Sequence, residues 1–193
     1  MGRGFGIPLI VRYVLQTCEN VKQAIEQLKR IPSHMAYNVT MVDRTGDFAT
    51  VMLAPGQQAI VTKQNVTTNH QQKIAWPEQA GFSKTVERKR HLELLLNTPG
   101  LNENQLIKAF HCPPLYSTNY QQNFGTVYTA VYKPESGTMA YHWPDEQWQH
   151  SFGLFNEGVK TVNLANQFSM HQRLKLLLIQ RLISLTKPLS NLT

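Results

Sequence analysis

The chain has 193 residues, of which 41% are hydrophobic and 16% charged, and its formal net charge is +7. This composition is typical of one soluble globular core and argues against a disordered chain or two small domains. Most of the excess positive charge lies in residues 156–193, and the remaining chain lacks the clustered basic and aromatic residues of a nucleic-acid-binding protein, so we expect no nucleic-acid partner.

Two helices are predicted at the start of the chain. Apolar residues at positions 7, 10, 11, 14 and 15 form one helical face. A capping box at Asn20 then predicts a second helix, which ends before Pro32. Cys18 falls in the short connection between the two helices.

From Ala36 the period of the apolar residues changes to two, which is typical of strands. Residues 37–43, 48–53, 59–62 and 66–68 are predicted to form an antiparallel meander. The polar run Thr67-Thr68-Asn69-His70 closes this block. We therefore expect its side chains at the end of a strand, on the rim of a sheet.

The middle of the chain is predicted to be helical after a loop. Residues 73–82 contain two breaker pairs, Trp76-Pro77 and Ala80-Gly81, and are predicted as a loop. A helix then runs from Ser83 until Pro99-Gly100 stops it. A shorter helix is predicted over residues 102–110.

The last third contains a predicted hairpin, formed by residues 125–132 and 138–142. Residues 174–185 are predicted as a leucine-rich basic helix that docks on the body, on a partner or on an anionic membrane surface. Hairpins with helices grouped between them predict an α+β fold with antiparallel sheets. We expect one main unit over residues 1–155 and a divergent tail over residues 156–193.

The sequence predicts neither a membrane span nor a cofactor. No stretch reaches the roughly 18 uninterrupted apolar residues that a bilayer requires. The pattern of a secretory signal peptide is also missing, so we expect a cytoplasmic protein. The histidines and the two cysteines lack metal-ligand spacing, and no glycine-rich phosphate loop follows a predicted strand.

The residues alone give no complete catalytic set. Cys112 follows His111, but adjacent side chains rarely point at each other well enough to form a thiol–imidazole pair. Cys18 precedes Glu19, and a neighbouring carboxylate weakens a thiol as a nucleophile. We expect both cysteines to be structural.

Asn69 has two interpretations. As a turn residue, its side chain would satisfy its own backbone. As a functional residue, its amide would donate a hydrogen bond to the oxygen that becomes negative when a nucleophile attacks an amide or thioester carbonyl. One such donor typically supplies about 3 kcal/mol of transition-state stabilisation.

Several motifs occur in order, with few gaps, over about residues 3–155. They are Gly4-Phe5-Gly6-Ile7-Pro8, Leu15-Gln16-Thr17-Cys18, His34 to Thr40, Asp43-x-x-Gly46, Leu53-Ala54-Pro55, Thr67-Thr68-Asn69-His70, Arg88-x-x-His91-Leu92-Glu93-x-Leu95-Leu96, Pro114-Leu115-Tyr116-Ser117-Thr118 and Phe124 to Tyr132. Together they resemble the acyl-coenzyme A:6-aminopenicillanic acid acyltransferase family of cysteine N-terminal-nucleophile (Ntn) hydrolases.

The resemblance implies a four-layer αββα sandwich, in which two antiparallel sheets lie between helical layers. It also implies a precursor that cleaves itself before a cysteine, which then acts as the nucleophile with its own α-amine as general base. An α-amine suits that role because its unperturbed pKa, about 7.7–8.0, is close to the operating pH. The implied substrates are linear amides or acyl thioesters, whose acyl group passes to water or to an amine.

Few residue roles follow from the resemblance. Asn69 matches the oxyanion-hole asparagine, which favours the donor interpretation. His70 and Arg88 are candidates for supporting the site, although a solvated helix face explains Arg88 equally well. Tyr37 and Tyr116 are the expected pocket linings. Penicillin-type substrates are not expected, since Phe124 replaces an arginine of the penicillin-forming members.

In the family, the nucleophilic cysteine and the first strands of one sheet precede the Gly-Phe-Gly-Ile-Pro motif. We therefore expect the sandwich to be incomplete at its N-terminus, with residues 1–155 as the C-terminal portion of the Ntn domain. The expected partners are the missing N-terminal part of the same enzyme and a small-molecule substrate. Exposed edge strands would also permit a homo-oligomer. The alternative is a stand-alone, non-catalytic remnant or binding module.

Overall fold

The computed structural model describes residues 2–71, 77–155 and 157–164. The two predicted N-terminal helices are confirmed as α1 (Ile7–Thr17) and α2 (Val21–Arg30), which are joined at Cys18. Asn20 caps α2, because its side chain accepts a hydrogen bond from the Gln23 N–H at 3.0 Å. The Gln23 side chain accepts from the Glu19 N–H instead of the Asn20 N–H, so the predicted box differs in one of its two bonds.

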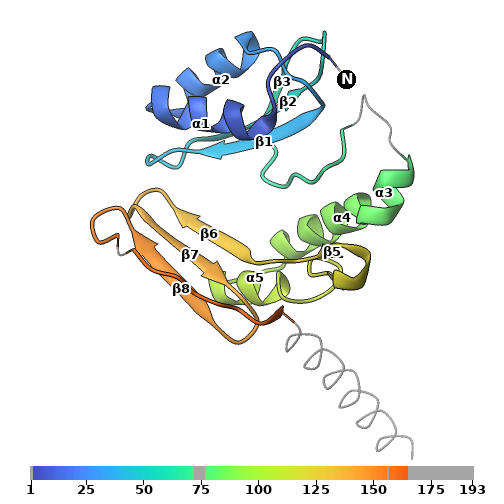
Figure 1. Cartoon of the computed structure of the whole chain (residues 1–193), viewed down its shortest axis with the longest axis vertical. Coiled ribbons are helices and arrows are strands. Elements are labelled where there is room, and N and C mark those ends of the chain that lie inside the picture. The colour runs from blue at the N-terminus through green and yellow to red at the C-terminus, as the bar shows by residue number, and fades with distance from the viewer. Residues whose placement is uncertain (1, 72–76, 156, 165–193) are drawn as a thin grey trace, which may run out of the picture.

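The first sheet has the order β1-β2-β3 and is antiparallel, with strands β1 (Tyr37–Val42), β2 (Phe48–Leu53) and β3 (Ile60–Thr62). Figure 1 shows α1 and α2 along one face of this sheet. The core lies between them. Its buried side chains are Ile10, Val14, Ala24, Leu28, Val51 and Leu53. Asn38, Thr40 and Thr50 stand on the opposite face, since side chains alternate along a strand.

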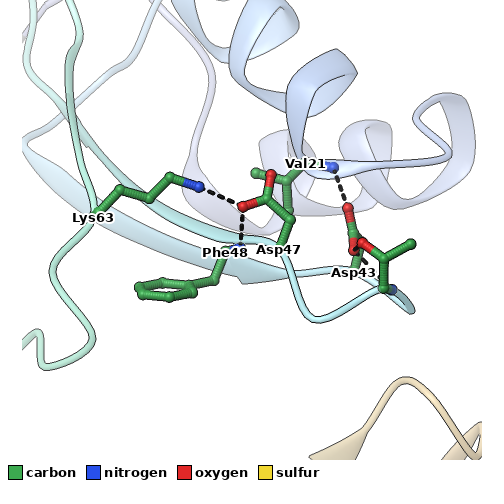
Figure 2. A network of polar contacts seen from close by, with 6 residues as sticks. Val21, Asp43, Asp47, Phe48 and Lys63 are labelled. Carbon is green, nitrogen blue, oxygen red and sulfur yellow. Dashed lines mark hydrogen bonds and ion pairs between the residues drawn. The ribbon is translucent and has the colours of Figure 1, made fainter.

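The turn after β1 ties the sheet to α2 (Figure 2). Asp43 accepts hydrogen bonds from the Thr45 hydroxyl at 2.6 Å, the Thr45 N–H at 2.9 Å and the Val21 N–H at 3.2 Å. Val21 is the first residue of α2, so its N–H has no acceptor within the helix. The bond from the Thr45 hydroxyl, followed by that from Val21, lowers the pKa of Asp43. Gly46 has a φ of +85°, which glycine adopts readily, so the Asp43-x-x-Gly46 motif is accounted for structurally.

The end of the same turn is fixed to the segment after β3. Asp47 forms an ion pair with Lys63 and accepts a hydrogen bond from the Phe48 N–H at 2.9 Å (Figure 2). The Lys63 ammonium also lies 5.5 Å from the centroid of the Phe48 ring. These contacts hold the start of β2 next to the segment that leads to Asn69.

The predicted strand at residues 66–68 is wrong, because this segment has no strand pairing. Side chains of the sheet hold it instead. The Thr50 hydroxyl donates to the Gln64 carbonyl at 3.0 Å, and the Thr40 and Thr67 hydroxyls lie 2.6 Å apart. The segment therefore lies against the sheet face opposite to α1 and α2.

The loop predicted over residues 73–82 is wrong for its described part, because α3 (Pro77–Ser83) lies there. Proline is favoured at the first turn of a helix, so Pro77 begins this helix and does not act as the predicted breaker. Lys84 has a φ of +51° and separates α3 from α4 (Thr85–Leu96), which begins two residues later than predicted. The short predicted helix is confirmed as α5 (Glu103–Ala109), with a full capping box between Asn102 and Gln105.

The remaining strands form two small antiparallel sheets. Strands β4 (Thr118–Asn119) and β5 (Phe124–Gly125) flank the 3-10 helix Tyr120–Gln122. The predicted hairpin is confirmed as β6 (Thr129–Lys133) and β7 (Thr138–His142), although its first strand begins four residues later than expected. The third strand of this sheet, β8 (Gln147–Ser151), was not predicted.

Helix α5 lies against one face of the β6–β8 sheet, behind it in Figure 1. Glu103 at its start pairs with Lys133 of β6 at 2.7 Å, and the His111 ring beyond its end lies 6.3 Å from that of His142. The other face carries Tyr141, Trp148 and neighbouring aromatic rings. Helices α1 and α2 thus cover one face of the β1–β3 sheet, and α5 covers one face of the β6–β8 sheet.

Helices and antiparallel sheets together make an α+β fold, as predicted. Within the described residues, the β1–β3 and β6–β8 sheets are separate three-stranded sheets. The four-layer sandwich therefore remains a prediction. None of the described helices is long and apolar enough to cross a membrane. The predicted helix at residues 174–185 lies outside the described residues, and the boundary between main unit and tail remains a prediction.

Candidate functional site

A cavity of about 430 Å³ lies where residues 63–71, which follow β3, pass between β1 and α3. We call residues 63–71 the crossing segment. Three predicted site residues line it together: Tyr37 at the start of β1, and Asn69 and His70 of the crossing segment. No acidic side chain is among its described lining residues. We call it the Asn69 cavity.

Asn38 of β1 holds the backbone on both sides of Asn69. Its Nδ2 donates to the Thr68 carbonyl at 2.7 Å and to the His70 carbonyl at 2.9 Å. An amide nitrogen carries two hydrogens, so one hydrogen is available for each carbonyl. A single side chain therefore fixes the Thr68–Asn69 and His70–Gln71 peptide units, one residue apart along the chain.

A second anchor follows directly after His70. The Gln71 side chain is 7% exposed, and its amide donates to the Leu53 carbonyl at 3.2 Å. This bond ties the end of the crossing segment to the end of β2. The segment is therefore anchored on both sides of Asn69, whose side chain is exposed and accessible to a ligand.

Arg88 of α4 orients the Asn69 side chain. The Arg88 Nη2 donates to the Asn69 Oδ1 over 3.4 Å, which is at the long end of the range for a hydrogen bond. Arginine has no acceptor atom, so the oxygen of the Asn69 amide must be the atom that faces it. The Asn69 Nδ2 is then left to donate to another group. This is the orientation that an oxyanion donor requires.

A second cavity, of about 360 Å³, contains the other two predicted residues, Arg88 and Tyr116. Ser83, at the junction of α3 and α4, lines both cavities. Arg88 is half-buried, and this burial lowers the pKa of its guanidinium. The structure thus divides the predicted residues between two cavities, which the contact from Arg88 to Asn69 connects. We call the second one the Arg88 cavity.

Tyr116 is part of a packed wall of the Arg88 cavity. It is 4% exposed, and burial raises the pKa of its hydroxyl, with the Tyr120 hydroxyl at 3.3 Å as the next cause. The Tyr120 hydroxyl donates to the Thr126 carbonyl at 2.8 Å. A Cβ on Gly125 would lie 1.9 Å from the Tyr120 ring, so this wall requires glycine there.

The two cysteines lie outside both cavities. Cys18 is half-buried at the end of α1, where the Thr17 hydroxyl lies 3.7 Å from its Sγ, and Cys112 is exposed. Neither lines the Asn69 cavity or the Arg88 cavity. Over the described ranges, no group of three or more His, Cys, Asp or Glu side chains is arranged to hold a metal ion.

Residues 1–148 match the family model described as acyl-coenzyme A:6-aminopenicillanic acid acyl-transferase. The chain belongs to this family. The matched region contains all five predicted site residues of the acyltransferase resemblance, together with Asn38. Comparisons with curated proteins and with solved structures found no match.

Sequence reasoning missed Asn38, although it interpreted the strand correctly. A signal was present, because Asn38, Thr40 and Thr50 place polar groups on one face of two paired strands whose other face is apolar. In the sequence, this pattern equally predicts a sheet face that is covered only by solvent. Only the path of the chain after β3 shows what these side chains bind.

Proposed function

We propose that the Asn69 cavity is an acyl-transfer centre for a linear amide or an acyl thioester. In this proposal the Asn69 Nδ2 donates a hydrogen bond to the carbonyl oxygen of the substrate as that oxygen becomes negative. The observation that carries the proposal is the fixed orientation of Asn69, whose flanking carbonyls bind Asn38 and whose Oδ1 binds Arg88. A donor that is oriented before the reaction stabilises the transition state without further reorganisation.

The nucleophile of this reaction is a cysteine that lies outside these 193 residues, with its α-amine as general base. Two observations support this part of the proposal. The family resemblance implies such a cysteine, and neither Cys18 nor Cys112 lines the Asn69 cavity. In this proposal Asn69 stabilises the negative charge on the substrate, whereas the attack that creates the charge comes from that cysteine.

The proposed complete enzyme is the four-layer αββα sandwich. Helices α1 and α2 would form one outer layer and α5 would contribute to the other. The inner faces would then be the Asn38 face of the β1–β3 sheet and the aromatic face of the β6–β8 sheet. The strands that accompany the nucleophile would complete the sheets.

The test uses the enzyme isolated from its native source, with its N-terminus determined by mass spectrometry. We expect a mature subunit that begins with cysteine and hydrolyses or transfers acyl groups from simple amides or acyl thioesters. Replacement of Asn69 by Ala should lower kcat by about a hundredfold or more, because one oxyanion donor is lost. Asn65→Ala, at an exposed position in the same segment, is the matched control.

Two results would overturn the proposal. Turnover that N69A leaves unchanged would exclude Asn69 as the donor. A native protein that lacks an N-terminal cysteine and has no acyl-transfer activity would favour the alternative, a stand-alone binding module.

A further inference from the structure

Arg88 carries a half-buried positive charge that no acidic side chain of the described residues neutralises. Within the described part of the chain, its guanidinium makes one hydrogen bond, the long one to the Asn69 Oδ1. Its Nε is buried without an acceptor, and no described Asp or Glu forms an ion pair with it. Burying an unpaired charge is costly, and a ligand in the Arg88 cavity that offers acceptors to the guanidinium would offset this cost.

The acids of the same helix are directed elsewhere. Glu87 lies 4.0 Å from the Lys84 ammonium, and Glu93 lies 3.7 Å from that of Lys89. Neither acid lines the Arg88 cavity, whereas Lys84 does. The charged side chains that line this cavity are therefore Arg88 and Lys84, both positive.

Apolar rings form another part of the wall. The rings of Phe82 and Phe124 lie 4.6 Å apart, and Leu115 and Pro114 line the same cavity. A ligand that fits here has an anionic group next to an apolar portion. The planar fork of an arginine matches a carboxylate or a phosphate with two parallel hydrogen bonds. We take the carboxylate as the ligand, and phosphate is the competing outcome of the test below.

We infer that Arg88 binds the carboxylate of an N-acyl amino acid whose amide carbonyl lies at Asn69. The inference rests on the proposed function, since it assumes that the reacting carbonyl is at Asn69. It adds the substrate class: the amine that the acyl group leaves or joins is an amino acid with a free carboxylate.

The span between the two groups agrees with this class. Asn69 and Arg88 are joined by a single 3.4 Å contact, so a substrate that meets both has its carbonyl and its anion close together. One extended residue covers about 3.3–3.6 Å. An amide separated from a carboxylate by one amino-acid residue therefore reaches both groups.

Binding to the ¹⁵N-labelled 193-residue chain tests the inference without requiring turnover. The probes are N-hexanoylglycine and its neutral analogue N-hexanoylglycinamide, titrated while the Arg88 Nε–H resonance is followed by NMR. We expect hexanoylglycine to bind at least tenfold more tightly than the amide and to shift this resonance. Arg88→Gln should remove the tenfold preference, whereas Arg90→Gln, at an exposed position of the same helix, should leave it intact.

Equal affinity for the two probes, no binding of either, or a preference that survives R88Q would overturn the inference. Tighter binding of inorganic phosphate than of hexanoylglycine would also overturn the choice of a carboxylate. If R88Q does not fold, the comparison of the two probes on the unmodified chain still decides. R88K, which keeps the charge and loses the planar fork, should then retain only part of the preference.

The two proposals fail in different ways. N69A should lower turnover by the native enzyme by about a hundredfold or more while leaving the affinity for hexanoylglycine within about twofold, because the carboxylate contact is separate from the oxyanion contact. A carboxylate preference without turnover in any native form would refute only the acyl-transfer proposal. Turnover of neutral and anionic amides at equal rates would refute only the inference about Arg88.

Discussion

Asn38 links β1 to the segment that carries Asn69, through two hydrogen bonds from one amide nitrogen. Replacement by Asp keeps the size of the side chain and removes both donors, so an oxygen would face two carbonyl oxygens. A hydrogen bond contributes about 0.5–1.5 kcal/mol net, so N38D should lower the free energy of unfolding by about 1–3 kcal/mol. Urea denaturation measures this change.

The functional consequence of N38D follows from the same geometry. Because the Asn38 amide holds the backbone next to Asn69, loss of its two hydrogen bonds should lower kcat of the native enzyme while KM changes little. Asn65→Asp is the control, since Asn65 is exposed. A variant with normal stability and normal kcat would mean that the two hydrogen bonds from Asn38 have no role in placing Asn69.

How far the sequence predicts this site depends on the residue. Asn69 and His70 are found because a polar run follows strand-like segments and matches a family motif. The position of Arg88 on a helix also follows from the sequence. Its contact with Asn69 does not, because it depends on how α4 packs beside the crossing segment. Asn38 was missed for the same reason, since its partners are backbone carbonyls 30 and 32 residues away.

At the scale of elements, the turn after β1 stabilises the start of α2 through Asp43. The pKa of this carboxyl is lowered in the folded protein, so Asp43 stabilises the fold above its unfolded pKa, near 3.8. This contribution is lost as the pH falls through the lower, folded pKa. Asp43→Asn should therefore reduce Tm at pH 7, and the difference from the unmodified chain should shrink from about pH 4 downward.

Thermal melts across this pH range, followed by circular dichroism, measure the effect. Asp145→Asn removes a carboxylate at an exposed position and should leave the pH dependence unchanged. A difference between D43N and the unmodified chain that stays constant into acid would show that the Asp43 charge does not matter. The loss of stability at pH 7 would then come from altered hydrogen bonding alone.

Elements with a local signal were predictable, and elements that depend on distant partners were not. Helices α1, α2 and α5 have apolar periodicity or a cap, and β1, β2 and the β6–β7 hairpin alternate between recognisable turns. The segment at residues 66–68 looks like a strand locally, but side chains of the sheet bind it in place of a backbone ladder. Strand β8 pairs with β7 although its alternating glutamines resemble a surface segment.

At the scale of the whole molecule, the core is distributed unevenly. Among the described apolar residues, those that are buried lie mostly between positions 10 and 66, and only Tyr116 and Trp143 reach that level in the second half. Several side chains of the β6–β8 region are open to solvent, including Tyr132 at 62% and Tyr128 at 50%. Local stability follows the density of buried apolar contacts. We therefore expect amides of α1, α2 and β2 to exchange hydrogen at least tenfold more slowly than those of β6–β8.

Leu28→Ala tests whether the two halves unfold together. Leu28 is 1% exposed in the core between α2 and the β1–β3 sheet, and such a truncation typically costs about 2–5 kcal/mol. Hydrogen exchange followed by mass spectrometry should then show faster exchange in α1, α2 and β2. Exchange in β6–β8 should stay the same, because these strands do not share that core. Equal acceleration in both halves would mean one cooperative unit, in which the contacts around Asn69 and Arg88 transmit the loss of the first core to the second sheet.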